Sequence, residues 1–513
     1  MCSFGKYSIA AVVLLFSVPV ICQNILFLQT TPSKSHHIWN KQIFDRLYEN
    51  GYNLTILSYE EEHSIPGKTF FYVANFYDKI MALYQNNGGS DADSEMTPIQ
   101  NIINMYDFYE KASGILITEK AITQLLDYPR SFKFELIIHD FTMGQFLLGF
   151  VERFGNPPLV SISAFNAPSY TAWLADIPTR VTTMPNYASN FGPNMTFLER
   201  CWNLFYWTLD YFYRQWIFMS NEDGRVRELF GMNSSSTTQL EKKSEIVLVN
   251  MDFSMDYHQS LPPNVIPVGG LHISRQEQLS PDLEEFLDRP SKAVILFSLG
   301  TNVKSEGLGL DINRAILDAF VSLPEYNFIW KHGDPVSLGS LPANVFVRSW
   351  IPQGKILSSG KVRLLISHGG LLSLQEAVWY GAPVVGIPFF ADQYQNVDKL
   401  VRAGVALRLP LPHLNRNSLT EVIQAILQND RYHENMLQRS KWFKNQPEMP
   451  LDRAIYSIEK VIQCKGSLHL QSPTNGMTPV QAYGIDLLVG AFITLALVRK
   501  LVRHLLSSVN KLS

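Results

Sequence analysis

Cysteine and net charge are both scarce in this chain. Its 513 residues include four cysteines, 43 Lys+Arg and 46 Asp+Glu, which leaves a formal net charge of −3. Four cysteines are too few for a disulfide-built scaffold, and without a basic surplus the chain lacks the usual electrostatic basis for binding nucleic acid. Because 46% of the residues are hydrophobic, disorder is excluded as well. The length predicts two or more globular domains.

The N-terminus has the pattern of a secretory signal peptide over residues 1–22. Lys6 precedes an apolar run from Ile9 to Phe16, and small or medium residues lead to a cleavage point near Cys22. An N-terminal anchor or a buried strand is the alternative interpretation. The signal peptide predicts that the rest of the chain enters the secretory pathway.

The remaining cysteines and three sequons fit a lumenal compartment. Asn53, Asn194 and Asn233 each begin a glycosylation sequon, which predicts a glycoprotein. Asn53 is the least convincing acceptor, because it borders a predicted strand. Cys201 and Cys464 could pair in an oxidising lumen, but their spacing alone does not establish a bond.

The C-terminus predicts a single membrane span. From Tyr483 to Val498 the chain is apolar except at Asp486 and Thr494, and a helix over 479–498 reaches the length of about 20 residues that a bilayer requires. Basic residues follow, which places the tail 499–513 on the cytoplasmic side. This orientation gives a single-pass type I protein with lumenal domains. An amphipathic helix lying on the membrane surface is the alternative.

An α/β pattern begins directly after the signal peptide. The apolar run Ile25–Leu28 predicts a buried strand, Ile38–Leu47 an amphipathic helix that ends at Asn50-Gly51, and Leu54–Leu57 a second strand. Phe134–His139 has the composition of a further strand. This βαβ unit predicts a parallel sheet with helices on its faces.

A second α/β pattern follows a polar stretch rich in proline and glycine. Strands are predicted at 294–297, 327–330, 363–366 and 384–387, with helical segments between them. We therefore expect two similar α/β domains facing each other across a cleft. The predicted organisation is a signal peptide (1–22), an N-terminal domain (23–260), a linker (261–291), a C-terminal domain (292–462), a juxtamembrane segment (463–478), a transmembrane helix (479–498) and a cytoplasmic tail (499–513).

Aromatic side chains crowd the segment Phe197–Phe218. Charged residues interrupt it often enough to exclude a membrane span. A helical hairpin in the core is the structural interpretation. A lipophilic substrate pocket or a surface that touches the bilayer is the functional one.

The most specific pattern lies between Trp350 and Asn396. A predicted strand ends at Ser367, His368-Gly369-Gly370 forms a turn, and a helix follows. Glycines at such a turn let the backbone approach a ligand, and the N-terminus of the helix favours an anion. Ser373 and Glu376 share a face of this helix, where a carboxylate can accept hydrogen bonds from sugar hydroxyls.

A second loop brings Asp392 and Gln393 to the same edge of the predicted sheet. The complete string resembles the signature of the UDP-glycosyltransferases, eukaryotic enzymes that conjugate small lipophilic molecules, and is most similar to insect members. It comprises Trp350, Pro352, Gln353, His368, Gly369, Gly370, Glu376, Pro383, Pro388, Asp392, Gln393 and Asn396. The resemblance covers essentially the whole chain. It implies a GT-B fold, with two Rossmann-like domains facing across a cleft and a C-terminal transmembrane helix.

The resemblance also assigns a donor site for a UDP-sugar in the C-terminal domain. Trp350 would stack on uracil, Gln353 would bond the nucleoside, and His368 would contact the diphosphate. Glu376 would hold the ribose hydroxyls, while the Asp392-Gln393 pair would hold the transferred sugar. The donor-binding set is Ser298, Gly300, Thr301, Trp350, Gln353, His368, Gly369, Gly370, Ser373, Glu376, Asp392 and Gln393.

In the N-terminal, acceptor-binding domain the resemblance places the catalytic base at His36 rather than His37, and Asp140 would orient it. The implied reaction is a one-step inverting displacement. His36 accepts a proton from an acceptor hydroxyl, which attacks the anomeric carbon as UDP leaves. No metal is expected, since the implied reaction does not need an Asp-x-Asp metal motif, and no cofactor is bound permanently.

The expected enzyme is a hexosyltransferase of the endoplasmic reticulum membrane that acts in detoxification or conjugation, with glucose favoured over glucuronic acid and a homo-oligomer possible. Three departures from the family pattern stand out: Leu372 replaces an Asn, Ser359-Gly360 replaces His-Pro, and Ser367 replaces a Thr. Two alternatives remain open. One is a non-catalytic lipophile carrier, and the other is a sugar-nucleotide epimerase, whose soluble location conflicts with the signal peptide.

Overall fold

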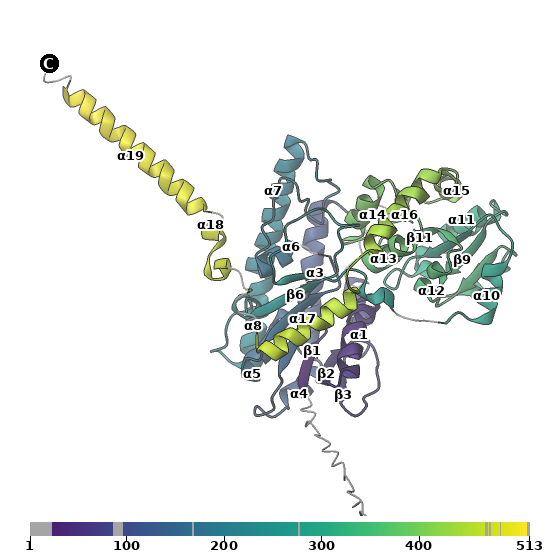
Figure 1. Cartoon of the computed structure of the whole chain (residues 1–513), viewed down its shortest axis with the longest axis horizontal. Helices are drawn as coiled ribbons and strands as arrows, with labels where there is room; N and C mark the ends of the chain where they lie inside the picture. Colours follow the sequence, from purple (N-terminus) through teal and green to yellow (C-terminus); the bar gives the residue numbers. More distant parts are fainter. Residues whose placement is uncertain are drawn as a thin grey trace, which may run out of the picture.

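A computed structural model describes residues 23–85, 96–166, 169–274, 278–466, 470, 473–482 and 484–509. The predicted signal peptide lies outside the described residues. The chain forms two lobes, each built on one parallel sheet, and a C-terminal helix that projects away from both (Figure 1). We call them the N-lobe and the C-lobe.

The N-lobe sheet has seven strands in the order β3-β2-β1-β4-β5-β6-β7, and all neighbours are parallel. The predicted strands at 25–28, 54–57 and 134–139 are confirmed, with the last beginning two residues later. The final strand lies inside the range predicted as a linker. The strands are β1 (Asn24–Leu28), β2 (Asn53–Ser58), β3 (Lys68–Tyr72), β4 (Leu136–Asp140), β5 (Leu159–Ser163), β6 (Ser244–Val249) and β7 (Val265–Pro267).

Helices cover both faces of this sheet, which is why its central strands are almost continuously apolar. One face packs against α1 (Lys34–Glu49) and α17 (Pro450–Cys464), where Trp39 and Ile458 share a buried cluster with Ile25. Figure 1 shows α17 returning to the N-lobe from the far end of the chain. The other N-lobe helices are α2 (Phe76–Gln85), α3 (Pro98–Leu116), α4 (Lys120–Leu126), α5 (Gly149–Arg153), α6 (Ser169–Ala175), α7 (Phe197–Phe212), α8 (Met219–Phe230) and α9 (Thr237–Glu241).

The aromatic segment is a continuous helix, so the predicted hairpin is wrong. α7 runs through a π-helical turn at Tyr213–Phe218 directly into α8. Two of its charged residues are buried together with their partners. Asp210 accepts a hydrogen bond from Tyr106 Oη at 2.7 Å, and Arg214 pairs with Glu241 at 2.5 Å.

The C-lobe sheet has six parallel strands in the order β10-β9-β8-β11-β12-β13. All four strands predicted for this region are confirmed. They are accompanied by two that were not predicted, β10 (Val345–Arg348) and β13 (Ala406–Arg408). The predicted four are β8 (Val294–Ser298), β9 (Asn327–Lys331), β11 (Val362–Ser367) and β12 (Val384–Gly386). The helices are α10 (Pro281–Asp288), α11 (Leu310–Val321), α12 (Gln353–Ser358), α13 (Leu371–Tyr380), α14 (Gln393–Arg402), α15 (Arg416–Leu427) and α16 (Asp430–Lys444).

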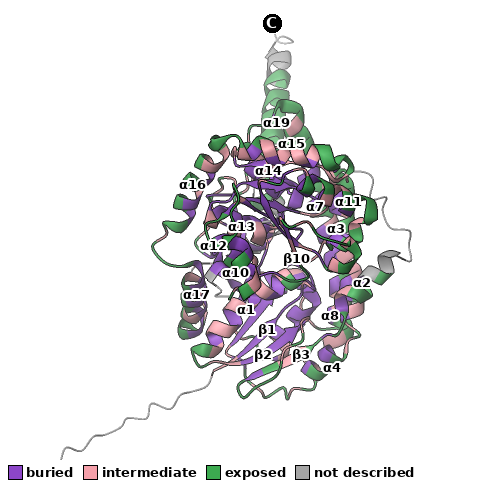
Figure 2. Ribbon diagram, turned by 90° about the vertical axis from the view of Figure 1, so that its right-hand side faces the viewer, coloured by how far each residue is buried: buried purple, intermediate pink, exposed green. Residues whose placement is uncertain are grey.

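The predicted transmembrane helix at 479–498 is not supported. Its range is divided between α18 (Pro479–Ala482) and α19 (Ile485–Val509), and α19 includes Asp486, Arg499 and Lys500. Across the described residues, no helix combines the length and the apolar content that a bilayer crossing needs. α19 is exposed along its described length, in contrast to the buried strands β1 and β2 (Figure 2). Cys201 and Cys464 are both exposed free thiols, so they are not paired.

Candidate active site

The carboxyl ends of strands from both sheets meet at the junction between the lobes. Ser33, which precedes α1, donates a hydrogen bond from Oγ to Asn302 Oδ1 of the C-lobe at 3.0 Å. Asn101 of α3 donates from Nδ2 to the backbone oxygen of Ala391 at 3.1 Å. Parallel α/β sheets bind ligands at this edge, so the junction is the place where a shared site can form.

His36 lies in the first turn of α1, just after the chain leaves β1. It is 5% exposed, its Nδ1 lies 3.8 Å from Asp140 Oδ2, and its ring packs edge-on against Phe165. His37 faces elsewhere, with its Nδ1 3.2 Å from Gln29 Oε1 and its Nε2 3.1 Å from Glu62 Oε1. The structure therefore brings together the two residues predicted as base and orienting carboxylate.

Asp140 is the last residue of β4 and is fully buried. β4 is the sheet neighbour of β1, which explains how residues far apart in the sequence meet. Burial raises the pKa of Asp140, but the facing His36 and the hydrogen bond from the Thr142 backbone N–H to Oδ1 (3.1 Å) outweigh it and hold the pKa below its usual value. Asp140 is therefore an anion at neutral pH, directed at His36.

His368 begins the turn between β11 and α13 and is held between two glycines. A Cβ on Gly300 would lie 2.3 Å from its Cε1, and a Cβ on Gly370 would lie 2.5 Å from the same atom. Gly300 also has a φ of +77°, which disfavours any side chain. The sequence predicted that glycines would admit a ligand to the backbone. The structure shows that they also make room for the imidazole.

The electrostatic setting of His368 differs from that of His36. Burial, together with repulsion from the nearby Lys331 ammonium, lowers the pKa of His368 to about 4. Lys331 itself donates from Nζ to the backbone oxygen of Gly300 at 2.7 Å. At neutral pH His368 is an uncharged imidazole that can donate a hydrogen bond to an anion. Ser298 and Ser367 end the neighbouring strands β8 and β11 in register beside it.

Three further predicted residues meet between α12 and α13. Gln353 donates from Nε2 to Glu376 Oε2 at 2.7 Å and to Ser373 Oγ at 3.0 Å. Glu376 also lies 4.0 Å from His272, a buried residue whose pKa burial lowers to about 4. His272 contacts the backbone oxygen of Leu372 at 3.2 Å. Sequence reasoning missed His272, because nothing in the polar stretch around it signals a site.

The departure at Leu372 has a packing explanation. Its side chain is partly buried against the apolar cluster formed by β1, α1 and α17 of the N-lobe. A polar amide there would face this apolar surface. The residue therefore joins the two lobes at the start of α13, in place of the hydrogen-bond donor that the family pattern carries.

The second predicted loop lies close to His36. Asn396 donates from Nδ2 to Asp392 Oδ2 at 2.6 Å, and Gln393 Oε1 accepts from the backbone N–H groups of Phe389 and Phe390. Burial raises the pKa of Asp392, whereas Asn396 and His36 oppose the rise. Ala391, the residue before Asp392, accepts the hydrogen bond from Asn101 of the N-lobe, so this loop lies at the lobe junction.

Trp350 is 44% exposed and is contacted by lysines from both lobes, Lys34 and Lys331. Neither lysine was predicted as a site residue. Lys34 could have been noticed from its position two residues before His36, and Lys331 from its place at the end of a predicted strand. Thr301 follows Gly300 in the loop that reaches α1 through Asn302.

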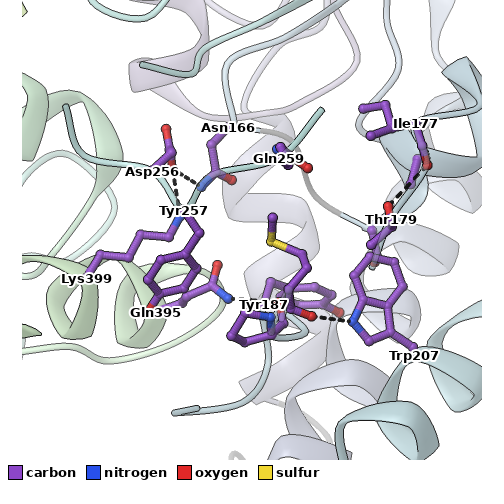
Figure 3. Close-up of a pocket in the computed structure, with 14 residues that line it drawn as sticks. Asn166, Ile177, Thr179, Tyr187, Trp207, Asp256, Tyr257, Gln259, Gln395 and Lys399 are labelled. Carbon is purple, nitrogen blue, oxygen red and sulfur yellow. Dashed lines mark hydrogen bonds and ion pairs between the residues drawn. The ribbon is translucent and has the colours of Figure 1, made fainter. Parts of the chain in front are cut away.

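A cavity of about 30 Å³ lies beside this site, between the lobes (Figure 3). It holds roughly two waters, which is too small for an organic acceptor. Trp207 of α7 lines it from the N-lobe, and Gln395 and Lys399 of α14 line it from the C-lobe. Lys399 pairs with the buried Asp256 at 2.7 Å, so the cavity is part of a polar joint between the lobes. Among the residues that the structure describes, no three His, Cys, Asp or Glu side chains form a group that could hold a metal ion.

Comparisons with known sequences place the chain in one family. The profile described as "UDP-glucoronosyl and UDP-glucosyl transferase" matches residues 27–511. "UDP-glucosyltransferase 2" of Dactylopius coccus is 28% identical over 89% of this chain and 88% of its own length, and "UDP-glycosyltransferase UGT5" of the same insect is 29% identical over 93% and 89%. "UDP-glucuronosyltransferase 2C1" of Oryctolagus cuniculus is 29% identical over 73% and 74%.

Comparisons with solved structures support the same architecture. The calicheamicin glycosyltransferase CalG4 aligns with a TM-score of 0.52 and 16% identity, covering 86% of this chain and 98% of that one. The spinosyn rhamnosyltransferase SpnG, solved with thymidine diphosphate, aligns with a TM-score of 0.54 and 15% identity over 85% and 100%. At this identity the likeness establishes the fold. The two Rossmann-like lobes are those of a GT-B glycosyltransferase, as the sequence predicted.

Proposed function

Because the chain belongs to the UDP-glucoronosyl and UDP-glucosyl transferase family, it is a glycosyltransferase that uses a UDP-sugar, and we propose that it transfers glucose, with inversion, to a hydroxyl of a small lipophilic acceptor. The observation that carries this proposal is the geometry of the lobe junction: His36 faces Asp140 at 3.8 Å, and hydrogen bonds from Ser33 and Asn101 of the N-lobe hold the C-lobe loops that contain Thr301 and Asp392. A base from one lobe and a donor site from the other can then act on a single pair of substrates.

The proposed chemistry follows from the position of His36. Its Nδ1 lies 3.8 Å from the Asp140 carboxylate, whose negative charge favours the tautomer with the proton on Nδ1, so that Nε2 is left to accept the proton of an acceptor hydroxyl. The imidazolium that forms is stabilised by the buried negative charge of Asp140. General-base help of this kind contributes about 10²–10⁴ in rate, and holding both substrates at one junction supplies much of the rest.

The proposed donor site accounts for the departing UDP. The N-terminus of α13 and the uncharged His368 offer hydrogen-bond donors where charge develops on the diphosphate. Trp350 offers a half-exposed aromatic face for uracil. Gln353 and Glu376 lie together for the nucleoside, and the loop that contains Asp392 and Gln393 is proposed for the transferred sugar.

The choice of glucose rests on the relatives. Two insect relatives match this chain along about nine-tenths of its length, and one of them is a glucosyltransferase by name. Mammalian glucuronosyltransferases match over 73% and 88% of this chain, so the preference for glucose comes from the printed name of the insect relative and not from coverage. We propose a role in detoxification or conjugation on the same grounds. We also propose entry into the endoplasmic reticulum, where the exposed Asn194 and Asn233 would be glycosylated.

The test is donor-dependent product formation by the full-length protein. It is incubated with UDP-glucose or UDP-glucuronate and a panel of phenols, and UDP release and conjugate mass are measured together. We expect a phenyl glucoside of inverted configuration with UDP-glucose. Conjugates formed with UDP-glucuronate alone would overturn the choice of sugar. Acceptor binding without UDP release from either donor would favour the lipophile-carrier alternative.

A further inference from the structure

Two lysines, one from each lobe, converge on Trp350. Lys34, the first residue of α1, has its Nζ 4.3 Å from the centre of the indole ring. Lys331, the last residue of β9, has its Nζ 4.5 Å from the same point. Both distances fall within cation–π range, and both cations therefore surround one small region of the junction.

Neither lysine forms an ion pair with a carboxylate of the described residues. Among the described residues, none places a carboxylate oxygen within 4.0 Å of either ammonium group, and Glu60 and Glu306 act on them only from farther away. Burial lowers the pKa of Lys331 to about 8, and Lys34 contributes to the shift by repulsion. Holding two like charges together without a counter-charge is unfavourable, so an anion between them would relieve the repulsion.

The position of the lysines identifies the anion. Lys331 donates to the backbone oxygen of Gly300, whose Cα lies against the His368 ring at the start of α13. Lys34 is held beside the same loop, because its neighbour Ser33 donates a hydrogen bond to Asn302. The two cations thus border the turn proposed for the diphosphate. Asp392, proposed for the sugar, lies instead within the influence of His36.

We propose that Lys34 and Lys331 form a divided subsite for the donor diphosphate, one cation from each lobe. The proposal rests on the proposed function and adds a consequence to it. Because Lys34 precedes His36 by two residues in the first turn of α1, the diphosphate that holds Lys34 also positions the base against the C-lobe. Lys34 is therefore a positioning residue, which links donor binding to the placement of His36.

Binding of uridine, UMP and UDP by calorimetry tests the subsite. The variants are Lys34→Gln and Lys331→Gln, and the control is Lys41→Gln, which removes a lysine of the same helix that pairs with Glu62 instead. We expect each test variant to lose about tenfold in affinity for UDP, less for UMP and least for uridine, because uridine lacks the phosphates and meets the lysines only beside Trp350. The control should match the wild type with all three ligands. Equal loss for uridine and UDP would overturn the proposal.

Steady-state kinetics test the positioning role. For Lys34→Gln we expect a raised KM for the UDP-sugar together with a lowered kcat, whereas Lys34→Arg should restore both, since it keeps the cation. Lys331→Gln should raise KM with a smaller change in kcat, because Lys331 is not part of α1, the helix that contains His36. An unchanged kcat in Lys34→Gln would remove the link to His36.

Two controls separate this inference from the proposed function. If the wild type binds UDP and releases it from a UDP-sugar while Lys34→Gln and Lys331→Gln bind UDP normally, the subsite alone is wrong. If the wild type neither binds UDP nor turns over, the proposed function fails with it. A loss confined to UDP-glucuronate, with UDP binding intact, would show that the lysines read a sugar carboxylate and would overturn the diphosphate assignment.

Discussion

The two imidazoles at the lobe junction occupy opposite electrostatic settings. His36 of the N-lobe faces the buried carboxylate of Asp140, and the pKa of Asp140 is held below its usual value. His368 of the C-lobe has no such partner: it is packed between Gly300 and Gly370, and burial together with Lys331 lowers its pKa to about 4. Both are almost fully buried, at 5% and 7% exposure, so solvent access does not explain the difference.

The contrast shows how one residue type can serve two purposes. A carboxylate behind an imidazole stabilises the protonated form, which suits a group that must take up a proton. A lysine near an imidazole disfavours the protonated form, which suits a hydrogen-bond donor that must stay uncharged. The nearest charged group, more than the histidine itself, separates the two proposed roles.

Removing His36 gives the largest expected effect. We expect His36→Ala to lower kcat by about 10²–10⁴, since the acceptor hydroxyl loses its proton acceptor. UDP affinity, measured by calorimetry, should remain near the wild-type value, because the substitution leaves every residue proposed to contact UDP in place, Lys34 included. The matched control is His37→Asn, which removes the neighbouring imidazole that faces Gln29 and Glu62. If both variants lost activity equally, the base would not be His36.

Removing the charge behind His36 should have the next largest effect. Asp140→Asn keeps the size of the side chain but lacks the negative charge and can hold the imidazole in the wrong tautomer, so we expect kcat to fall by roughly 10². The double variant with His36→Ala separates this role from structural damage. If the two residues act as one unit, Asp140→Asn should cost little further once His36 is absent. Additive losses would argue against the pair.

The sequence predicted the donor side of this comparison more completely than the acceptor side. His368, Glu376 and Asp392 lie on one short stretch of chain, where strand, turn and helix signals are local. The meeting of His36 with Asp140 depends on β1 and β4 being sheet neighbours, and only the family resemblance supplied the pair in advance.

Long-range packing accounts for the features that sequence reasoning missed. α17 covers the N-lobe sheet although it follows the C-lobe in sequence, because an amphipathic pattern reveals the apolar face of a helix but not its partner. Lys34 and Lys331 were missed for a related reason. Neither lysine is distinguished by its own segment of sequence. Their shared position beside Trp350 depends on how the two lobes pack together.

Substitution of the glycines around His368 tests how this imidazole is held in the C-lobe. A methyl group on Gly370 would lie 2.5 Å from the imidazole, so Gly370→Ala should displace His368 and weaken UDP binding by about tenfold. The φ of Gly370 is −63°, which alanine tolerates, so the same substitution in a His368→Ala background should cost little. Gly300→Ala should remain harmful in that background, because its φ of +77° is strained for any side chain. If the His368→Ala background rescued both glycine variants equally, crowding of the imidazole would explain both losses and the φ of Gly300 would carry no cost of its own.

The uncharged state of His368 predicts the smallest effect, a pH dependence of stability. The unfolded chain binds a proton at this histidine with an ordinary pKa near 6.5, whereas the folded chain does so only near pH 4. As the pH falls from 7 towards 4, protons bind to the unfolded state first, so stability decreases. Between pH 7 and 5.5 the loss is about 1 kcal/mol for this residue. His368→Asn removes this titrating group. The free energy of unfolding is measured with urea at pH 7 and at pH 5.5 for both proteins. Its decrease between the two pH values should be about 1 kcal/mol smaller in the variant than in the wild type. Comparing the two pH values cancels the packing cost of the substitution, so identical pH dependences would mean that His368 is protonated equally in both states and that its proposed contrast with His36 is wrong.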